Sequence, residues 1–146
     1  MYCNDYNPIR RQILMDRLCN YQSVSRCICI LVFDAYRVPR DVEDVIQYHN
    51  ISVVFTKQAE TADTYIERAT YEIGKKHRVR VATSDMAEQM IVMGHGARRM
   101  SANELKMDVD AAIAKLQETV ADWNERERTR HVYKPFREMT KQDEKK

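Results

Sequence analysis

Residues 51–63 read Ile-Ser-Val-Val-Phe-Thr-Lys-Gln-Ala-Glu-Thr-Ala-Asp, an apolar run followed by a turn and two acids. The apolar residues at its start predict a short buried strand that ends at Thr56. A turn through residues 57–59 follows, and a helix then begins with Glu60 and Asp63 on its first turn. Acidic side chains near a helix N-terminus interact favourably with the helix dipole, which explains their presence without a catalytic or binding role. The two acids alone therefore do not define a site.

Two other strand-like runs end in the same way. Residues 28–33 are apolar and lead into Asp34, and residues 79–83 lead into Asp85. Strands alternate with helical segments along the chain, which predicts an α/β fold with a mostly parallel sheet and right-handed crossovers. Open α/β sheets bind ligands beyond the carboxyl ends of their strands. We therefore expect these acids and those of residues 51–63 to lie along one edge of the sheet.

Several carboxylates in a small volume repel one another unless a proton or a cation lies between them. Mg²⁺, with Mn²⁺ as the alternative, suits such a cluster because it binds one or two carboxylates and keeps several waters. A bound divalent ion can activate water and stabilise the leaving oxygen of a phosphodiester. The acids therefore predict hydrolysis of a nucleic-acid backbone. The sequence has no Gly-rich phosphate loop, no Gly-x-Ser-x-Gly elbow and no spaced Cys and His pair that would support another catalytic scheme.

Basic residues near these acids are candidates for RNA binding. Lys57, Arg98 and Arg99 flank the acidic cluster and could hold phosphates. A solvated surface explains the three cations equally well. His95 lies between two glycines and could touch a substrate, although a plain loop position is the more common role for such a histidine.

Length, composition and charge limit the possible domain organisation of the chain. The chain has 146 residues and a formal net charge of +2, a length that predicts one domain. Residues 126–146 carry eight Lys and Arg against four Asp and Glu, so the basic excess lies in this tail. We expect the folded domain to span residues 9–125 and residues 126–146 to form a charged, disordered tail.

The four cysteines, Cys3, Cys19, Cys27 and Cys29, lie in the first fifth of the chain. Their spacing fits buried free thiols better than a disulfide or a metal hook. The sequence shows no signal peptide and no apolar run near 18 residues. These observations predict a protein of the reducing cytosol, in the cytoplasm, without a membrane partner.

Helical spacing of apolar residues predicts amphipathic helices over 9–21 and 60–75. Pro39 and the apolar positions after it predict a short helix that ends near Asn50. A strand is expected over 97–100.

Two further features concern the later helices. Ser84 or Asp85 can cap a helix in which Met86, Met90 and Met93 recur at helical spacing, a pattern typical of a buried core. Ser101 and Glu104 form a capping box before a long helix.

Four segments in order carry a family resemblance: Val-Phe-Asp-Ala-Tyr (32–36), Glu-Thr-Ala-Asp (60–63), Ala-Thr-Ser-Asp (82–85) and Gly-His-Gly-Ala-Arg-Arg-Met-Ser-Ala-Asn-Glu-Leu (94–105). Over about residues 9–121 the chain resembles the YacP-like NYN domains, a branch of the PIN-like nucleases that includes a ribosome-associated mRNA endonuclease. The resemblance implies a three-layer α/β/α sandwich, metal-dependent RNA cleavage and contact with the ribosome. It also implies metal-binding roles for Asp34, Asp63 and Asp85, with Glu60 as a nearby helper.

The chain departs from the family at its start. Family members open with an apolar strand that ends in Asp-Gly-Tyr-Asn and lies in the middle of the sheet. Residues 5–7, Asp-Tyr-Asn, do not match it because no apolar run precedes them. The strands on either side must then close up, recruit residues 1–7, or pair with another chain in a homo-oligomer. The family's later Ser-Ala-Arg-Glu is also Ser-Ala-Asn-Glu here, which removes one basic group.

Three functions follow from these observations. The first is a metal-dependent endoribonuclease that cleaves single-stranded RNA, including mRNA on the ribosome. The second is an RNA-binding or ribosome-binding module with weak or absent nuclease activity, which the missing strand and the basic tail favour. The third is a gene fragment that does not fold alone.

Overall fold

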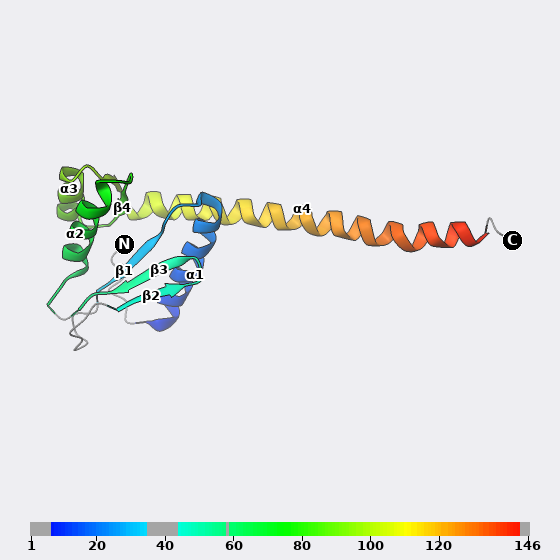
Figure 1. Cartoon of the computed structure of the whole chain (residues 1–146), viewed down its shortest axis with the longest axis horizontal. Coiled ribbons are helices and arrows are strands. Elements are labelled where there is room, and N and C mark those ends of the chain that lie inside the picture. The colour runs from blue at the N-terminus through cyan, green and yellow to red at the C-terminus, as the bar shows by residue number, and fades with distance from the viewer. Residues whose placement is uncertain (1–6, 35–43, 58, 144–146) are drawn as a thin grey trace.

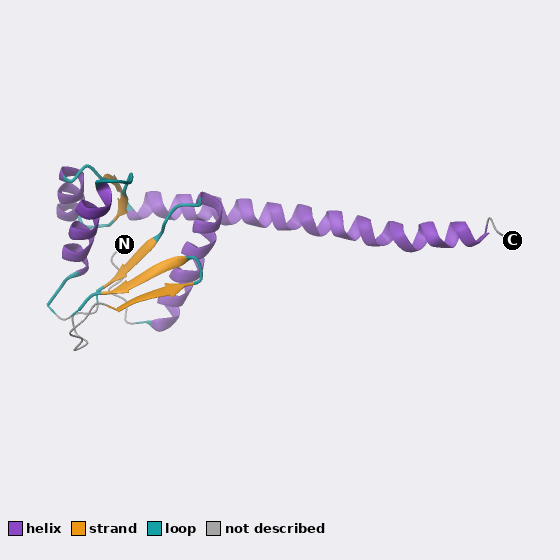
Figure 2. Cartoon of the chain, in the orientation of Figure 1, coloured by secondary structure: helices purple, strands orange, loops and turns teal. Residues whose placement is uncertain are grey.

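The computed structural model describes residues 7–34, 44–57 and 59–143, with side chains to residue 130. Helices and strands alternate along most of the chain (Figures 1 and 2). The elements are α1 (Pro8–Ser25), β1 (Ile30–Phe33), β2 (Asp44–Tyr48), β3 (Ile51–Phe55), α2 (Ala62–Gly74), β4 (Arg80–Ala82), α3 (Met86–Gly94), β5 (Arg98–Met100) and α4 (Ala102–Asp143).

The larger sheet has the strand order β1-β3-β2. β1 and β3 are parallel, as the sequence predicts, whereas β2 is antiparallel to β3. The predicted helix that ends near Asn50 is therefore wrong over residues 44–48, and its start at Pro39 lies outside the described residues. The tight turn at His49 and Asn50 lets β2 fold back on β3, and pairing along all of β3 outweighs the helical spacing.

The main hydrophobic core lies between this sheet and two helices. Leu18 and Tyr21 of α1 and Val109 of α4 pack against buried side chains of β1 and β3. Phe33, which is 1% exposed, stacks on Phe55 with 5.5 Å between ring centroids. Helix α1, predicted from apolar spacing over 9–21, is thus fixed on one face of the sheet.

The smaller sheet pairs β4 with β5 in parallel. It has its own core of Val81, Val92 and Ala97, against which Ile66 of α2 packs. The predicted methionine core of α3 is wrong: Met86 is 78% exposed and Met90 71% exposed.

The buried face of α3 is a different one. Glu88, Gln89 and Val92 are the buried residues of this helix. Because a helix turns 100° per residue, the side chains at 86, 90 and 93 point away from the face that holds 88, 89 and 92. The buried carboxylate of Glu88 therefore lies on the core-facing side of α3, where the sequence predicts methionine side chains.

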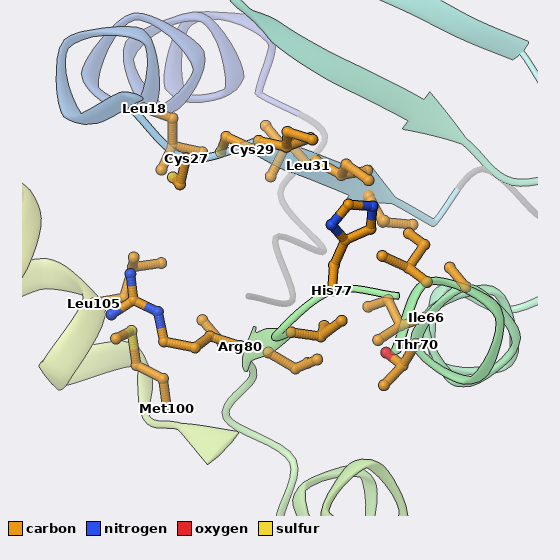
Figure 3. A pocket seen from close by; sticks show the side chains of 18 of the residues that line it. Leu18, Cys27, Cys29, Leu31, Ile66, Thr70, His77, Arg80, Met100 and Leu105 are labelled. Carbon is orange, nitrogen blue, oxygen red and sulfur yellow. The ribbon is translucent and has the colours of Figure 1, made fainter. Parts of the chain in front are cut away.

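The two sheets do not pair with each other through any described strand. A cavity of about 630 Å³ lies between them (Figure 3). Leu31 of β1 and Arg80 of β4 lie on opposite sides of it, and Ile66 of α2 lies at one end. Three arrangements were expected in place of the missing central strand. The first, in which the flanking strands close up, is excluded because β1 and β4 do not pair with each other. Recruitment of residues 1–7 lies largely outside the described residues.

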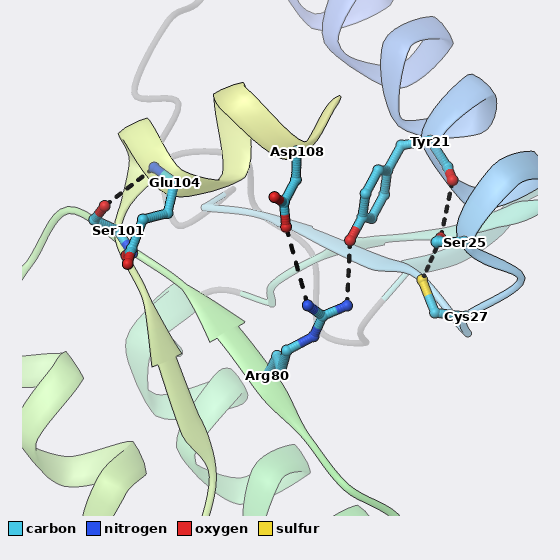
Figure 4. Close-up of polar contacts among 7 residues, drawn as sticks. All are labelled: Tyr21, Ser25, Cys27, Arg80, Ser101, Glu104 and Asp108. Carbon is cyan, nitrogen blue, oxygen red and sulfur yellow. Dashed lines mark hydrogen bonds and ion pairs between the residues drawn. The ribbon is translucent and has the colours of Figure 1, made fainter. Parts of the chain in front are cut away.

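Side chains bridge the two sheets where strands do not. Arg80 of β4 donates a hydrogen bond to the Tyr21 hydroxyl of α1 at 3.2 Å and lies 4.0 Å from the Asp108 carboxylate of α4 (Figure 4). The predicted capping box is confirmed, because the Glu104 N–H donates to Ser101 Oγ and the Ser101 N–H donates to Glu104 Oε2. These hydrogen bonds lower the pKa of Glu104.

Helix α4 differs from the sequence expectation in length. It continues to Asp143, and its second half extends well beyond the rest of the molecule (Figure 1). Residues 126–143 are therefore helical rather than disordered. Glu, Arg and Lys are good helix formers, and the Glu127 and Arg130 side chains lie 3.4 Å apart on one face.

The cysteines agree with the sequence expectation where they are described. Cys19, Cys27 and Cys29 are free and partly buried, and Cys3 lies outside the described residues. Burial raises the pKa of the Cys29 thiol to about 11, which keeps it protonated at neutral pH.

Replacing Phe33 with Ala tests the main core. The change removes the buried ring and leaves a cavity, so we expect the free energy of unfolding to fall by about 3–5 kcal/mol. Urea denaturation followed by circular dichroism measures it. Ile28→Ala is the matched control, because Ile28 is 83% exposed, and a loss as large as that of Phe33→Ala would contradict the core described here.

Candidate active site

The centre of the site is a contact between two carboxyl groups, Asp63 of α2 and Glu88 of α3. Asp63 lies in the first turn of α2, which Thr61 caps by accepting a hydrogen bond from the Thr64 N–H. Glu88 lies in the first turn of α3 and is 3% exposed. Burial raises the pKa of Glu88, the hydrogen bond and charge of Asp63 raise it further, and the Thr83 hydroxyl opposes them.

The carboxylate oxygens of this region are poorly satisfied. Both oxygens of Glu88 and Oε2 of Glu60 are buried, and no described group makes a hydrogen bond of good geometry to them. Thr83 and Asp63 lie near enough to Glu88 to shift its pKa. Neither of them makes a hydrogen bond of good geometry to the Glu88 oxygens. Buried polar atoms rarely go unsatisfied, and a bound ion, water or proton is the usual resolution.

Glu60 lies at the turn between β3 and α2. Its N–H donates to the Lys57 carbonyl at 3.2 Å, and its Oε1 lies 3.1 Å from the Arg68 guanidinium. Arg68 thus balances the charge of Glu60 from the second turn of α2, while the other carboxylate oxygen faces the interior.

Asp34 and Lys57 follow the paired ends of two neighbouring strands. Phe33 of β1 is the register partner of Phe55 of β3, and the Thr56 N–H donates to the Phe33 carbonyl at 3.1 Å. The residues that follow, half-buried Asp34 and Lys57, therefore emerge at the same edge. This is the carboxyl edge that the sequence predicts for the site.

Asp85 has a structural role in addition to any chemical one. Its Oδ1 accepts hydrogen bonds from the Ala87 N–H at 2.8 Å and the Glu88 N–H at 3.4 Å, so Asp85 is the one of the two predicted candidates that caps α3. The structure brings Glu88 beside Asp63, and a metal-binding role for Asp85 stays a prediction. Sequence reasoning missed Glu88, although its position three residues after the cap and four before Val92 marks it as an inward-facing acid of a capped helix.

The predicted RNA-binding residues separate into two groups. Arg99 donates a hydrogen bond to the Gln89 side chain at 2.9 Å, and Gln89 donates one to the Thr83 carbonyl at 2.8 Å. Gln89 therefore links the Arg99 guanidinium to Thr83, which follows β4. Arg98 is exposed at the amino end of β5.

His95 does not lie beside Glu88. It lies at the opposite end of α3 from Glu88, and a nine-residue helix is roughly 13 Å long. Its Nε2 is 3.5 Å from the Glu67 carboxylate, and its ring meets Tyr71 edge-on.

The fit of these residues to a metal ion is partial. Among residues 7–34, 44–57 and 59–143, no three His, Cys, Asp or Glu side chains are arranged as a metal site. The Asp63 and Glu88 carboxyl groups nevertheless suit a hard divalent cation, since Mg²⁺ needs only one or two carboxylates and retains water. The buried oxygens of Glu88 are the donors that such an ion would satisfy.

The relationship to known proteins agrees with this geometry. The model of the YacP-like NYN domain matches residues 5–145. The chain belongs to the YacP-like NYN domain family. NYN domains are a branch of the PIN-like nucleases.

Individual relatives support the assignment. Over 111 residues the chain is 36% identical to the uncharacterized protein YacP of Bacillus subtilis (strain 168), a match that covers 75% of this chain and 65% of that protein. The chain thus spans less than two thirds of the length of this relative.

Two crystal structures of Rae1 (YacP) from Bacillus subtilis match the fold, each with a TM-score of 0.69. The W164L mutant is 32% identical and aligns with 81% of this chain and 69% of its own. The other structure is 31% identical, with 92% and 77% covered. The α/β/α class inferred from the sequence is confirmed by these matches.

Glu88→Gln tests the strain at the site through its pH dependence. The pKa of Glu88 in the folded protein lies above its ordinary value of 4.5, so the folded state holds the proton more tightly than the unfolded state. The free energy of unfolding of the parent must therefore fall as pH rises from that ordinary value through the raised pKa. Glutamine carries no charge and escapes this loss.

We expect Glu88→Gln to be more stable than the parent by about 1–3 kcal/mol at pH 8, and the difference to shrink at pH 4. Thermal melts at the two pH values measure it. Glu72→Gln is the matched control because Glu72 is an exposed acid of α2. A difference that does not depend on pH would contradict the buried, charge-penalised Glu88.

Proposed function

We propose that this chain is a metal-dependent endoribonuclease of the cytosol that cleaves single-stranded RNA, with mRNA on the ribosome as its cellular substrate. The observation that carries the proposal is the contact between buried Glu88 and half-buried Asp63 at the carboxyl edge of an NYN-family sheet. Two such carboxyl groups retain a proton or attract a divalent cation, and neither arrangement serves the core alone.

The chain's own residues have distinct roles in this proposal. Asp63 and Glu88 would hold Mg²⁺ or Mn²⁺, and Asp34 at the end of β1 is a further candidate ligand. Such an ion would supply activation of water and stabilisation of the leaving oxygen of the phosphodiester. Arg99 and Lys57 bind the phosphates on either side of the scissile bond, because guanidinium and ammonium groups contact RNA mainly through phosphate oxygens. Glu60, balanced by Arg68, keeps the edge acidic.

An RNA-binding module without cleavage is the second candidate. The observation that favours it is α4, whose distal part carries the basic excess of the chain and extends beyond the folded body (Figure 1). Helices of this kind bind RNA backbones by charge, so their affinity falls steeply with salt. Binding and cleavage are separable by product analysis. No described helix combines the length and the apolar character needed to cross a lipid bilayer.

Cleavage of a labelled single-stranded RNA in Mg²⁺ or Mn²⁺ tests the first candidate. We expect Asp63→Asn and Glu88→Gln each to lower the cleavage rate by on the order of 100-fold or more, because each removes a carboxylate from the reacting centre. Asp85→Asn keeps the cap of α3, since Asn caps nearly as well as Asp. It therefore retains most of the rate if Asp85 is only a cap and loses the rate if Asp85 is also a ligand.

Glu72→Gln again serves as the matched control and keeps full activity. Salt-sensitive RNA binding by the parent with no product in either metal would replace the nuclease proposal with the binding module. Product that persists in both Asp63→Asn and Glu88→Gln would refute the site.

Metal binding has a readout that does not depend on activity. We expect millimolar Mg²⁺ to raise the Tm of the parent, because a ligand that binds only the folded state stabilises it. The same addition should leave the Tm of the Glu88→Gln variant unchanged. An equal rise in both proteins, measured by differential scanning fluorimetry, would show that Mg²⁺ acts elsewhere.

A further inference from the structure

Helix α2 and its C-cap residue carry basic and aromatic side chains along one exposed face. Arg68, Tyr71 and Lys75 follow one another at spacings of three and four residues, which places them on the same side of the helix. The Lys75 ammonium lies 4.4 Å from the centre of the Tyr71 ring, which is 53% exposed. We call these three residues the α2 stripe. It begins beside the acids, because Arg68 is the ion-pair partner of Glu60.

The α2 stripe leads into a group of exposed cations, which we call the basic cluster. The basic cluster consists of Lys75, Lys76, Arg78 and Arg98. Residues 75–80 contain four Lys and Arg and no acid. Arg98 of β5 lies beside this run, because its N–H donates to the Val79 carbonyl at 2.9 Å. Positive charge is therefore concentrated where α2 ends and β4 and β5 begin.

The basic cluster and the acids lie at opposite ends of α2. Asp63 lies in the first turn of this helix, and Lys75 follows Asp63 by twelve residues. At 1.5 Å per residue the two positions are roughly 18 Å apart. Helix α3 runs beside α2 (Figure 1), and the His95 ring at its end meets the Tyr71 ring edge-on with 5.6 Å between centroids. The Tyr71 ring is thus held between Lys75 and His95.

The basic cluster stands out against the charge of the chain around it. Residues 1–125 carry 16 Lys and Arg against 18 Asp and Glu, so this part of the chain is slightly acidic. The dipole of α2 favours cations close to its carboxyl end, but it does not account for Arg98 of β5. Neighbouring cations repel one another. An anion that contacts several of them would offset this repulsion.

The combination of cations with an exposed ring fits a single-stranded nucleic acid. Basic side chains follow the phosphates, and an aromatic ring stacks on a base that is not already held in a duplex. Nucleotides stacked as in one strand of a duplex rise about 3.4 Å each, so roughly 18 Å corresponds to about five nucleotides. One strand could therefore contact the acids and the basic cluster at the same time.

We propose that the α2 stripe and the basic cluster form a second RNA-binding surface, which holds single-stranded RNA on one side of the bond that is cleaved. The Tyr71 ring stacks on a base, and the basic cluster binds phosphates about five nucleotides from the reacting phosphodiester. The choice of RNA as the ligand rests on the proposed function.

Fluorescence anisotropy tests the stacking contact without cleavage, with the full chain in EDTA and a labelled single-stranded oligouridylate of about twelve nucleotides. We expect Tyr71→Ala to weaken binding about fivefold or more, because one base loses its stacking partner. Tyr71→Phe keeps the ring and should bind like the parent. Trp123→Ala is the matched control, because Trp123 is an exposed ring of α4. Equal affinity of Tyr71→Ala and the parent, or no binding by the parent, would overturn the proposal.

The salt dependence of binding tests the basic cluster. Each phosphate contact on a single strand contributes about 0.7 to the slope of log affinity against log salt, so we expect Lys75→Gln with Lys76→Gln to reduce the slope by about 1.4. Lys106→Gln with Lys115→Gln is the matched control, because it removes the same charge from exposed positions in the first half of α4. Equal slopes for the two double variants would contradict phosphate binding at the cluster.

Two further results would also overturn the proposal. Duplex RNA of the same length that binds as tightly as the single strand would exclude base stacking on Tyr71. A loss of affinity that appears only on replacing Arg126, Arg128 and Arg130 with Gln would place the RNA on α4 instead. Because the measurement needs neither metal nor product, its failure is distinguishable from failure of the nuclease proposal. RNA cleavage that is unaffected by Tyr71→Ala, with unchanged binding, would leave the nuclease proposal intact and refute only the second surface.

Discussion

The structure depends on helices and side chains to hold together two sheets that share no described strand pairing. Strand ladders normally fix the spacing of neighbouring strands through many backbone hydrogen bonds. Here α1 and α4 pack on the larger sheet, and Arg80 of the smaller sheet reaches Tyr21 and Asp108 on those helices. Exposed ion pairs contribute little, so apolar packing around the cavity must supply most of this cohesion.

The position of the acids follows from the same arrangement. Asp63 lies in the first turn of the helix after β3, and Glu88 lies in the first turn of the helix after β4, so their contact crosses from one sheet to the other. A buried, unsatisfied carboxylate costs folding free energy. Such a cost persists in a protein when the group is needed for something other than packing, which is why Glu88 carries more functional information than the exposed Asp85.

The sequence predicts those features that depend on local pattern. The cap of α3 at Asp85, the capping box at Ser101, and the parallel pairing of β1 with β3 arise from residues close in sequence or from the alternation of elements. The carboxyl edge of the sheet is predicted for the same reason.

The features that the sequence does not predict depend on contacts between distant segments. Residues 44–48 have helical spacing, but a two-residue turn places them against β3, where pairing prevails. The face of α3 that turns inward depends on how β4, β5 and α2 surround it, and spacing alone does not distinguish Met90 from Glu88. His95 lies close in sequence to the helix that carries Glu88, but the length of α3 places it at the opposite end of that helix, beside Glu67.

The cavity and the acidic pair are physically linked. A contact between carboxyl groups is sensitive to small shifts, because electrostatic energy in a buried site changes steeply with distance. The Asp63 and Glu88 contact joins elements that follow different sheets, and the cavity lies between those sheets. Any change in the distance between the two sheets would therefore change the energy of this contact and the affinity of the two acids for a divalent ion.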